Sequence, residues 1–139
     1  MGQSIREMTL VAEISMRAFC ERLYCAHVPP DAFTIGPDGR MAFVALATDS
    51  GQTTEHHVEF SAVHDFVRPR EVRARSEPGD RLELSVIEIE HGPSNWRVWL
   101  NPWYLEEVEF RCTRILLDGA EIIGEGRWLQ DELPTRSAG

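Results

Sequence analysis

Apolar and polar residues alternate along most of this chain, which is the pattern of β-strands that bury one face. The segments that show this pattern lie at about 8–15, 40–48, 55–67, 81–91, 96–100, 106–117 and 120–130. Turn residues separate them, and Asp118-Gly119 between two apolar runs is a strong hairpin signal. We therefore predict about seven antiparallel strands.

The period lengthens near residue 16 to the spacing of an amphipathic helix. The residues on this stripe are Met16, Phe19, Cys20, Leu23, Tyr24 and His27. They predict a helix over about 16–27. Pro29-Pro30 ends it, because the residue before a proline disfavours helical geometry. The alternative is a single longer helix over 4–28.

Three further details of the pattern bear on the architecture. Both faces of segment 40–48 are apolar, which predicts a central strand covered on both sides. The apolar phase slips between Val86 and Ile87, which indicates a β-bulge or a strand that crosses between two layers. Asn101-Pro102 is a possible start for a helix over 103–112, but the alternation through that segment favours a strand.

Together these elements predict a mainly β (α+β) fold. About seven antiparallel strands would form a curved sheet, small barrel or sandwich, with one N-terminal amphipathic helix. The length of 139 residues suits a single domain over 1–139 with one core. Residues 134–139 are expected to be a frayed tail.

Charge narrows the range of partners. The formal net charge is −9, whereas nucleic-acid binders usually carry a basic face, so no nucleic-acid partner is expected. All 14 basic residues are arginine, which excludes Schiff-base chemistry and a P-loop lysine. The arginine-rich segment 68–81 also holds carboxylates, which favours a self-paired polar edge over a site for an acidic partner.

Hydropathy and cysteine usage indicate the compartment. No apolar run approaches the roughly 20 residues of a membrane span, and the first residues lack the pattern of a secretory signal. The 3 cysteines are odd in number and show no CxxC spacing, which fits a reducing environment. We expect a soluble, cytoplasmic protein with no membrane partner.

Histidine spacing does not predict a metal site. His56 and His64 would lie roughly 26 Å apart on one continuous strand. His57 and Glu59 share a face at roughly 7 Å, but they lack a third ligand. No metal and no other cofactor is therefore expected.

Catalytic motifs do not stand out, so an enzyme is uncertain and not favoured. Cys20 and Cys25 are about 140° apart around a helix and do not converge. His27 and Asp31 are candidates for an acid–base pair, or they complement the helix dipole and start a turn. His64 lies on an apolar face, which predicts a core histidine or a neutral base or donor in an apolar pocket.

Aromatic residues concentrate between positions 96 and 104. Trp96 should face the core, which leaves Trp99, Trp103 and Tyr104 as candidates for a surface or a pocket. Tryptophan is enriched in protein interfaces and also lines ligand pockets. We therefore expect a protein-interaction or oligomerisation module that forms a homo-oligomer or binds another protein. The alternative is a barrel that binds a small apolar or acyl ligand, with His64 in the cavity.

One segment resembles a known family. Pro78-Gly79-Asp80-Arg81-Leu82-Glu83-Leu84, with the strand, turn, strand and hairpin that follow and a helix near the start, is similar to hotdog-fold acyl-thioester proteins. The resemblance implies that the alternative function would be that of a hotdog-like enzyme. In that family, a helix marked by glycine and proline follows the second strand. This helix is missing here, since 49–67 is predicted as loop and strand. No site residue is carried over.

Overall fold

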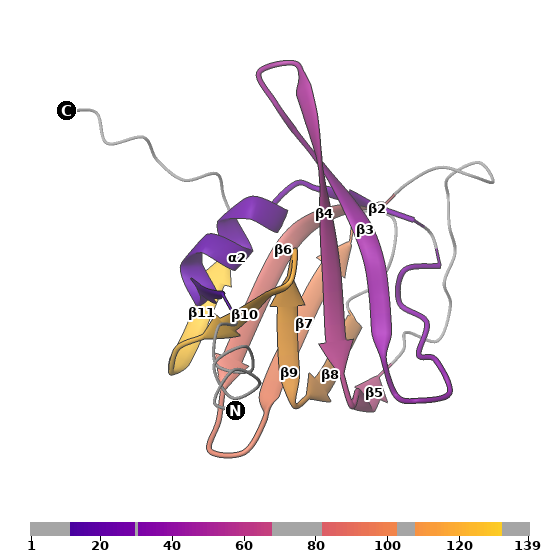
Figure 1. The fold of residues 1–139 in the computed structure, drawn as a ribbon, viewed down its shortest axis with the longest axis vertical. Coiled ribbons are helices and arrows are strands. Elements are labelled where there is room, and N and C mark those ends of the chain that lie inside the picture. The colour runs from indigo at the N-terminus through magenta and orange to yellow at the C-terminus, as the bar shows by residue number, and fades with distance from the viewer. Residues whose placement is uncertain (1–11, 30, 68–81, 103–107, 132–139) are drawn as a thin grey trace, which may run out of the picture.

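The computed structural model describes residues 12–29, 31–67, 82–102 and 108–131 (Figure 1). Over these residues the chain is mainly β with one helix, as the alternation predicts. The elements are β1 (Glu13–Ser15), α2 (Met16–Leu23), β2 (His27–Val28), β3 (Met41–Asp49), β4 (Gln52–Ser61), β5 (His64–Val67), β6 (Leu82–His91), β7 (Trp96–Pro102), β8 (Val108–Cys112), β9 (Arg114–Leu117), β10 (Ala120–Ile123) and β11 (Gly126–Gln130).

The strands join in one curved sheet, which the described residues do not close into a barrel. Its order is β1-β10-β9-β4-β3-β2-β6-β7-β8-β5, and β11 pairs with β6 beside this path. The pairing of β1 with β10 is parallel, whereas the other pairings described are antiparallel. Of the three predicted architectures, the curved sheet is the one that the structure has.

Three predicted strands are each divided in two. Segment 120–130 is interrupted between β10, which pairs with β9, and β11, which pairs with β6. Segment 55–67 is interrupted between β4 and β5, where Ala62 has a φ of 52°. Segment 106–117 is interrupted at Thr113, whose amide donates to the Ser61 carbonyl at 3.0 Å. The prediction of one continuous strand is therefore wrong in all three places. Left-handed backbone at a non-glycine residue leaves no mark in the hydrophobic pattern.

The helix is shorter than predicted. Ser15 caps its N-terminus by accepting a hydrogen bond from the Ala18 amide at 3.1 Å. The backbone turns extended at Tyr24 and left-handed at Cys25, so the expected continuation to residue 27 is wrong. Segment 25–28 pairs with β6 instead, and the Cys25 amide donates to the Leu84 carbonyl at 2.8 Å. The described part of 4–28 also contradicts a single long helix.

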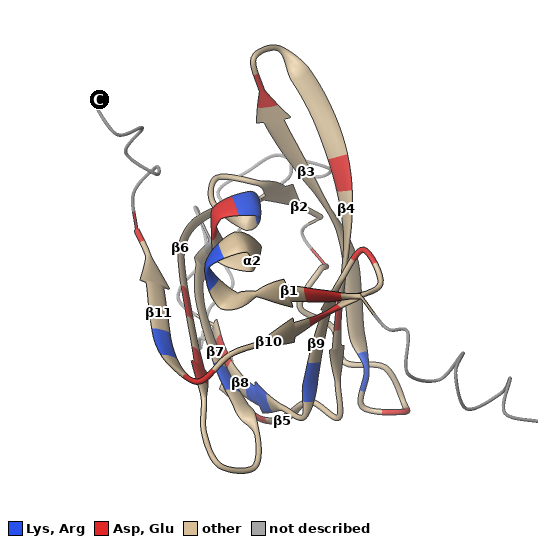
Figure 2. Cartoon of the chain, turned by 60° about the vertical axis from the view of Figure 1, so that its left-hand side comes forward, with Lys and Arg blue, Asp and Glu red and all other residues tan. Residues whose placement is uncertain are grey.

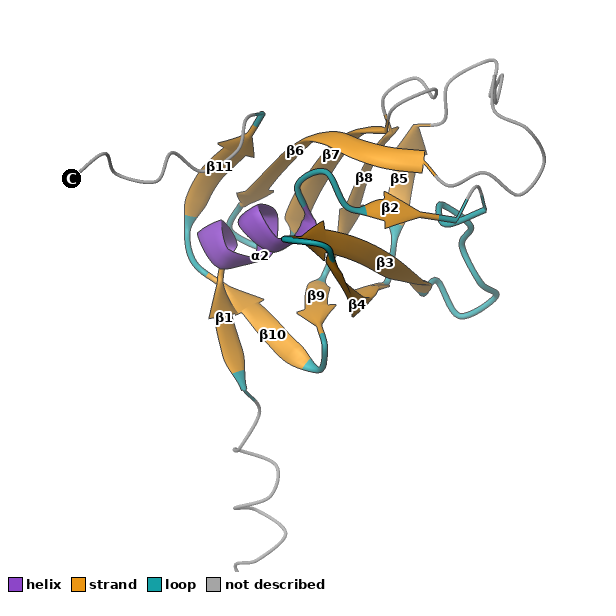
Figure 3. Cartoon of the chain, turned by 90° about the horizontal axis from the view of Figure 1, so that it is seen from above, coloured by secondary structure: helices purple, strands orange, loops and turns teal. Residues whose placement is uncertain are grey.

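The core lies on the concave side of the sheet, where α2 is also found (Figures 2 and 3). The helix contributes four buried side chains: Met16, Phe19, Cys20 and Leu23. A line of aromatic contacts crosses the interior, through Phe33, Phe43, Phe60, Phe110 and Phe66. The one helix of the described residues, α2, is not long and apolar enough to cross a membrane.

Several local predictions can be compared directly with the structure. β3 is central, between β4 and β2, but Ala42 is exposed and Val44 half-buried, so the predicted cover on both faces is wrong. The bulge is confirmed by a register shift between Leu84 and Val86. The Asp118-Gly119 hairpin is confirmed as well, with positive φ at both residues. Segment 108–112 is a strand, which excludes the helical alternative there.

Candidate functional site

The structure describes some of the predicted binding residues and places them differently from one another. His64 is exposed, and its Nδ1 lies 2.9 Å from the Ala62 carbonyl oxygen, so its expected burial, in the core or in an apolar pocket, is wrong. The turn at Ala62 brings Val63 to the core instead. Trp103 and Tyr104 lie outside the described residues.

The two described tryptophans of β7 separate as predicted. Trp96 is buried in the core and stacks on His91, with 4.1 Å between the ring centroids. Trp99 points to the opposite side and is half-buried. Alternating residues of a strand face opposite sides of its sheet, so Trp99 belongs to the convex, outer side of β7.

Outer-facing residues of five adjacent strands align with Trp99 in two rows. The strands are β11, β6, β7, β8 and β5, in that spatial order. The first row, which we call the acidic row, consists in register of Leu129, Glu88, Trp99, Glu109 and Val67. The second, the basic row, consists of Arg127, Glu90, Arg97, Arg111 and His64. We call the two rows together the banded face.

Apolar side chains are unusually exposed on this face. Val67 is 61% exposed and Leu129 is 43% exposed, and both share the acidic row with Trp99. They account for two of the four exposed large hydrophobic residues that the described part of the chain contains. The structure thus brings His64 and Trp99 onto one surface, although it does so at an outer face and not in a cavity.

Ion pairs tie the two rows together. Arg97 Nη1 lies 3.1 Å from Glu88 Oε1, and Arg127 Nε lies 3.2 Å from Glu88 Oε2. Arg97 Nε also lies 3.7 Å from Glu109 Oε2. The hydrogen bond to Glu88 is the main reason that the pKa of Arg97 is raised. These contacts hold the charged side chains across the strands and fix the pattern that the face presents.

The banded face carries no net formal charge, unlike the chain as a whole. Its three carboxylates balance its three guanidinium groups when His64 is neutral, whereas the chain carries −9. Figure 2 marks the charged positions of these strands in blue and red. A balanced face can approach a copy of itself without the repulsion that the rest of the surface would cause.

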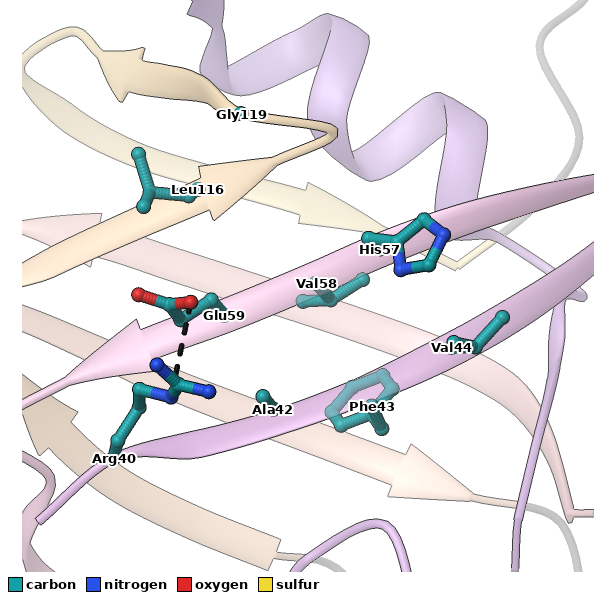
Figure 4. Close-up of a pocket in the computed structure, with 9 residues that line it drawn as sticks. All are labelled: Arg40, Ala42, Phe43, Val44, His57, Val58, Glu59, Leu116 and Gly119. Atoms are coloured by element: carbon teal, nitrogen blue, oxygen red, sulfur yellow. Dashed lines mark ion pairs between the residues drawn. The ribbon is translucent and has the colours of Figure 1, made fainter.

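A groove lies on another part of the convex side, over β3, β4 and β9 (Figure 4). Its volume is about 340 Å³, and it is lined by Arg40, Ala42, Phe43, Val44, His57, Val58, Glu59, Leu116 and Gly119. Ala42, Val44 and Leu116 provide outward-facing apolar surface. Arg40 Nε lies 3.8 Å from Glu59 Oε1 at one side, and His57 lies at the other.

A histidine–aspartate pair links β4 to the turn between β9 and β10. Asp118 Oδ2 lies 2.8 Å from His56 Nδ1, and its Oδ1 accepts the His57 amide at 2.7 Å. Burial alone would raise the pKa of Asp118, but hydrogen bonds from His56 and the His57 amide lower it overall. The sequence reasoning missed this pair, because the residues are far apart in the chain and carry no spacing motif.

Other candidates from the sequence do not form a chemical centre. The described residues contain no group of three or more potential metal ligands. Burial raises the pKa of Cys20 and of Cys112 to about 12, so neither thiol is poised as a thiolate. His27 lies in β2, not in a last helical turn, and its Nε2 is 3.5 Å from Glu83 Oε2.

The fold and the banded face together define a mainly β domain with a patterned outer surface. Comparisons with protein-family models, curated proteins and solved structures find no match for the chain. Any function must therefore be argued from the residues themselves.

Proposed function

We propose that the chain is a protein-interaction module that self-associates through the banded face. The observation that carries the proposal is the acidic row, in which Trp99 shares a register with the exposed Leu129 and Val67. These apolar side chains recur on every second strand of the row, alternating with Glu88 and Glu109, and exposed apolar surface is one mark of a contact surface. Tryptophan and arginine are the residues that most often dominate binding energy at such surfaces.

Electrostatics supports the same proposal. Two copies that each carry −9 repel one another at long range, and a locally balanced contact surface adds no further repulsion at short range. The banded face is balanced, and its Arg97 and Glu88 side chains are already held in place by ion pairs. Side chains that are ordered before binding lose less conformational entropy when the partner docks.

Light scattering over a range of concentrations tests the proposal. We expect the unmodified chain to approach twice its monomer mass at high concentration and Trp99→Ala to remain monomeric. Leu129→Glu should weaken association at least tenfold without touching the core, because Leu129 is exposed. Ile123→Ala, which removes an exposed apolar side chain from β10, is the matched control and should leave the mass unchanged. A dimer that survives both Trp99→Ala and Leu129→Glu would exclude this face.

We also propose, as a second candidate, that the groove binds a small apolar or acyl ligand. Its apolar floor between polar ends supports this, as does a volume near the lower end of ligand sites. Titration with octanoate, followed by NMR, should shift the signals of Ala42 and Val44 in a saturable way. Leu116→Arg should abolish the shifts and Ile123→Arg should not. No saturable shift in the unmodified chain would rule the candidate out for this ligand class.

A further inference from the structure

The groove over β3, β4 and β9 combines apolar walls with one charged end (Figure 4). β4 is the middle strand of the three, and its outward side chains Glu59 and His57 lie roughly 7 Å apart, the spacing of alternate residues. Ala42 and Val44 of β3 stand in register with them on one side, and Leu116 of β9 stands on the other. The apolar walls therefore extend over about the length of one side chain.

The charged end consists of Arg40 and Glu59, which form only a loose ion pair. Arg40 Nε lies 3.8 Å from Glu59 Oε1, whereas charge-assisted hydrogen bonds to a carboxylate measure about 2.7–2.9 Å. The two side chains are 55% and 32% exposed, and exposed pairs of this kind contribute little stability. The described residues make no other side-chain hydrogen bond or ion pair to either group. Both therefore keep the capacity to bind a ligand.

A zwitterion satisfies both charged groups at once. A free α-amino acid carries its ammonium and its carboxylate on one carbon, so the opposite charges lie only roughly 3 Å apart. That spacing is similar to the 3.8 Å between Arg40 Nε and Glu59 Oε1. The ligand carboxylate can accept two parallel hydrogen bonds from the guanidinium, and the ligand ammonium can donate to Glu59. The ligand side chain then lies along Ala42 and Val44, towards His57.

Head groups with a single charge match this end less well. A carboxylate that pairs with Arg40 is repelled by Glu59, and an ammonium that pairs with Glu59 is repelled by Arg40. The net charge of −9 also opposes the approach of an anion. An amino acid with an uncharged side chain has no net charge at neutral pH and escapes this repulsion.

We infer that the groove binds a free α-amino acid with an aliphatic side chain, whose head group lies on Arg40 and Glu59. The inference rests on the second candidate function and narrows its ligand class. The aliphatic side chain follows from the walls that Ala42, Val44 and Leu116 form, and from a volume of about 340 Å³, near the lower end of ligand sites. Because the ligand is small and the ion pair is exposed, the dissociation constant should be in roughly the millimolar range.

Three probes with one carbon skeleton test the head group. L-leucine carries both charges, 4-methylpentanoate lacks the ammonium, and 3-methylbutylamine lacks the carboxylate. Each is titrated at pH 7 to roughly 20 mM, well above the expected dissociation constant. The NMR signals of Ala42 and Val44 follow binding. We expect L-leucine to bind at least tenfold more tightly than either truncated probe.

Neutral variants of the two charged residues assign each contact. Glu59→Gln should weaken the binding of L-leucine at least fivefold without weakening that of 4-methylpentanoate. Arg40→Gln should weaken the binding of L-leucine to a similar extent without weakening that of 3-methylbutylamine. A residue that only shaped the groove would change the binding of all three probes together.

A second ion pair provides matched controls. Arg114 Nε lies 3.4 Å from Glu121 Oε2, and these side chains are 43% and 37% exposed. They change the net charge as Arg40 and Glu59 do, but they do not line the groove. Arg114→Gln and Glu121→Gln should therefore bind L-leucine as the unmodified chain does.

The outcomes separate the inference from the second candidate function. Saturable binding of octanoate or of either truncated probe that is as tight as that of L-leucine overturns the zwitterion and leaves the groove as a ligand site. Binding of L-leucine that survives both Glu59→Gln and Arg40→Gln overturns the position of the head group. No saturable shift with any of these probes overturns both the inference and the candidate function.

Discussion

Asp118 illustrates how one side chain can link distant parts of the chain. Its carboxylate contacts His56 and the His57 amide on β4, while its own amide donates to the His57 carbonyl at 2.8 Å. Its positive φ is also needed for the turn into β10. Asparagine tolerates this backbone nearly as well as aspartate does, so Asp118→Asn isolates the charge.

We predict that Asp118→Asn lowers the free energy of unfolding by about 1 kcal/mol at neutral pH. Hydrogen bonds to charged groups contribute about 1.5–3 kcal/mol, and solvent screening reduces this because the Asp118 side chain is 40% exposed. The folded state lowers the pKa of Asp118. The stabilisation is therefore present above the unfolded-state pKa and is lost as pH falls through the folded-state pKa.

Urea denaturation at several pH values checks this prediction. The difference in stability between the two proteins should shrink as the pH falls below about 4, the ordinary range for an aspartate. Asp49→Asn, at the turn of the β3–β4 hairpin, is the control. The hydrogen bond found at the Asp49 carboxylate comes from the neighbouring Ser50 and not from a distant strand. A pH-independent difference would show that the charge of Asp118 does not contribute.

For helices and strands, the hydrophobic pattern predicts the type of each element better than it predicts the residues at which the element begins and ends. The alternation correctly indicates a mainly β chain, the bulge in β6 and the Asp118-Gly119 hairpin. It misses the interruptions at Ala62 and Cys25, where non-glycine residues adopt left-handed backbone. Both lie beside backbone hydrogen bonds to distant parts of the chain, from the Cys25 amide to Leu84 and from the Val63 amide to Gly39.

The candidate site was predictable only in part, for a related reason. The period of two places Trp99 opposite to Trp96 without any structural information. The position of His64 depends on the turn at Ala62, and the neighbours of Trp99 depend on the register between strands. Glu88 and Val67 lie in one row with Trp99 only because four strands pair in one particular alignment, which is a tertiary property.

For the whole molecule, the proposed self-association sets a locally balanced face against a net charge of −9. The like net charges of two copies repel over long distances, and salt screens this repulsion with a Debye length of about 8 Å at 0.15 M. Ion pairs in the contact act at short range and are screened less.

We therefore predict that self-association strengthens several-fold when NaCl is raised from 10 to 150 mM. Sedimentation equilibrium at fixed pH gives the dissociation constants directly. Association that weakens steadily with salt would mean that attraction between charges, and not apolar contact on a balanced face, drives the dimer.

The parallel pairing of β1 with β10 has a consequence for how the chain is made. Glu13 pairs with Glu121, so β1 finds its place only after the chain through β10 has been synthesised. Ribosomes add roughly 5–20 residues per second, so β1 waits several seconds or more for its partner. During that time the β3–β4 hairpin, whose strands are joined by a two-residue turn, can already form. The pairing of β1 is thus expected to be later than that of the β3–β4 hairpin.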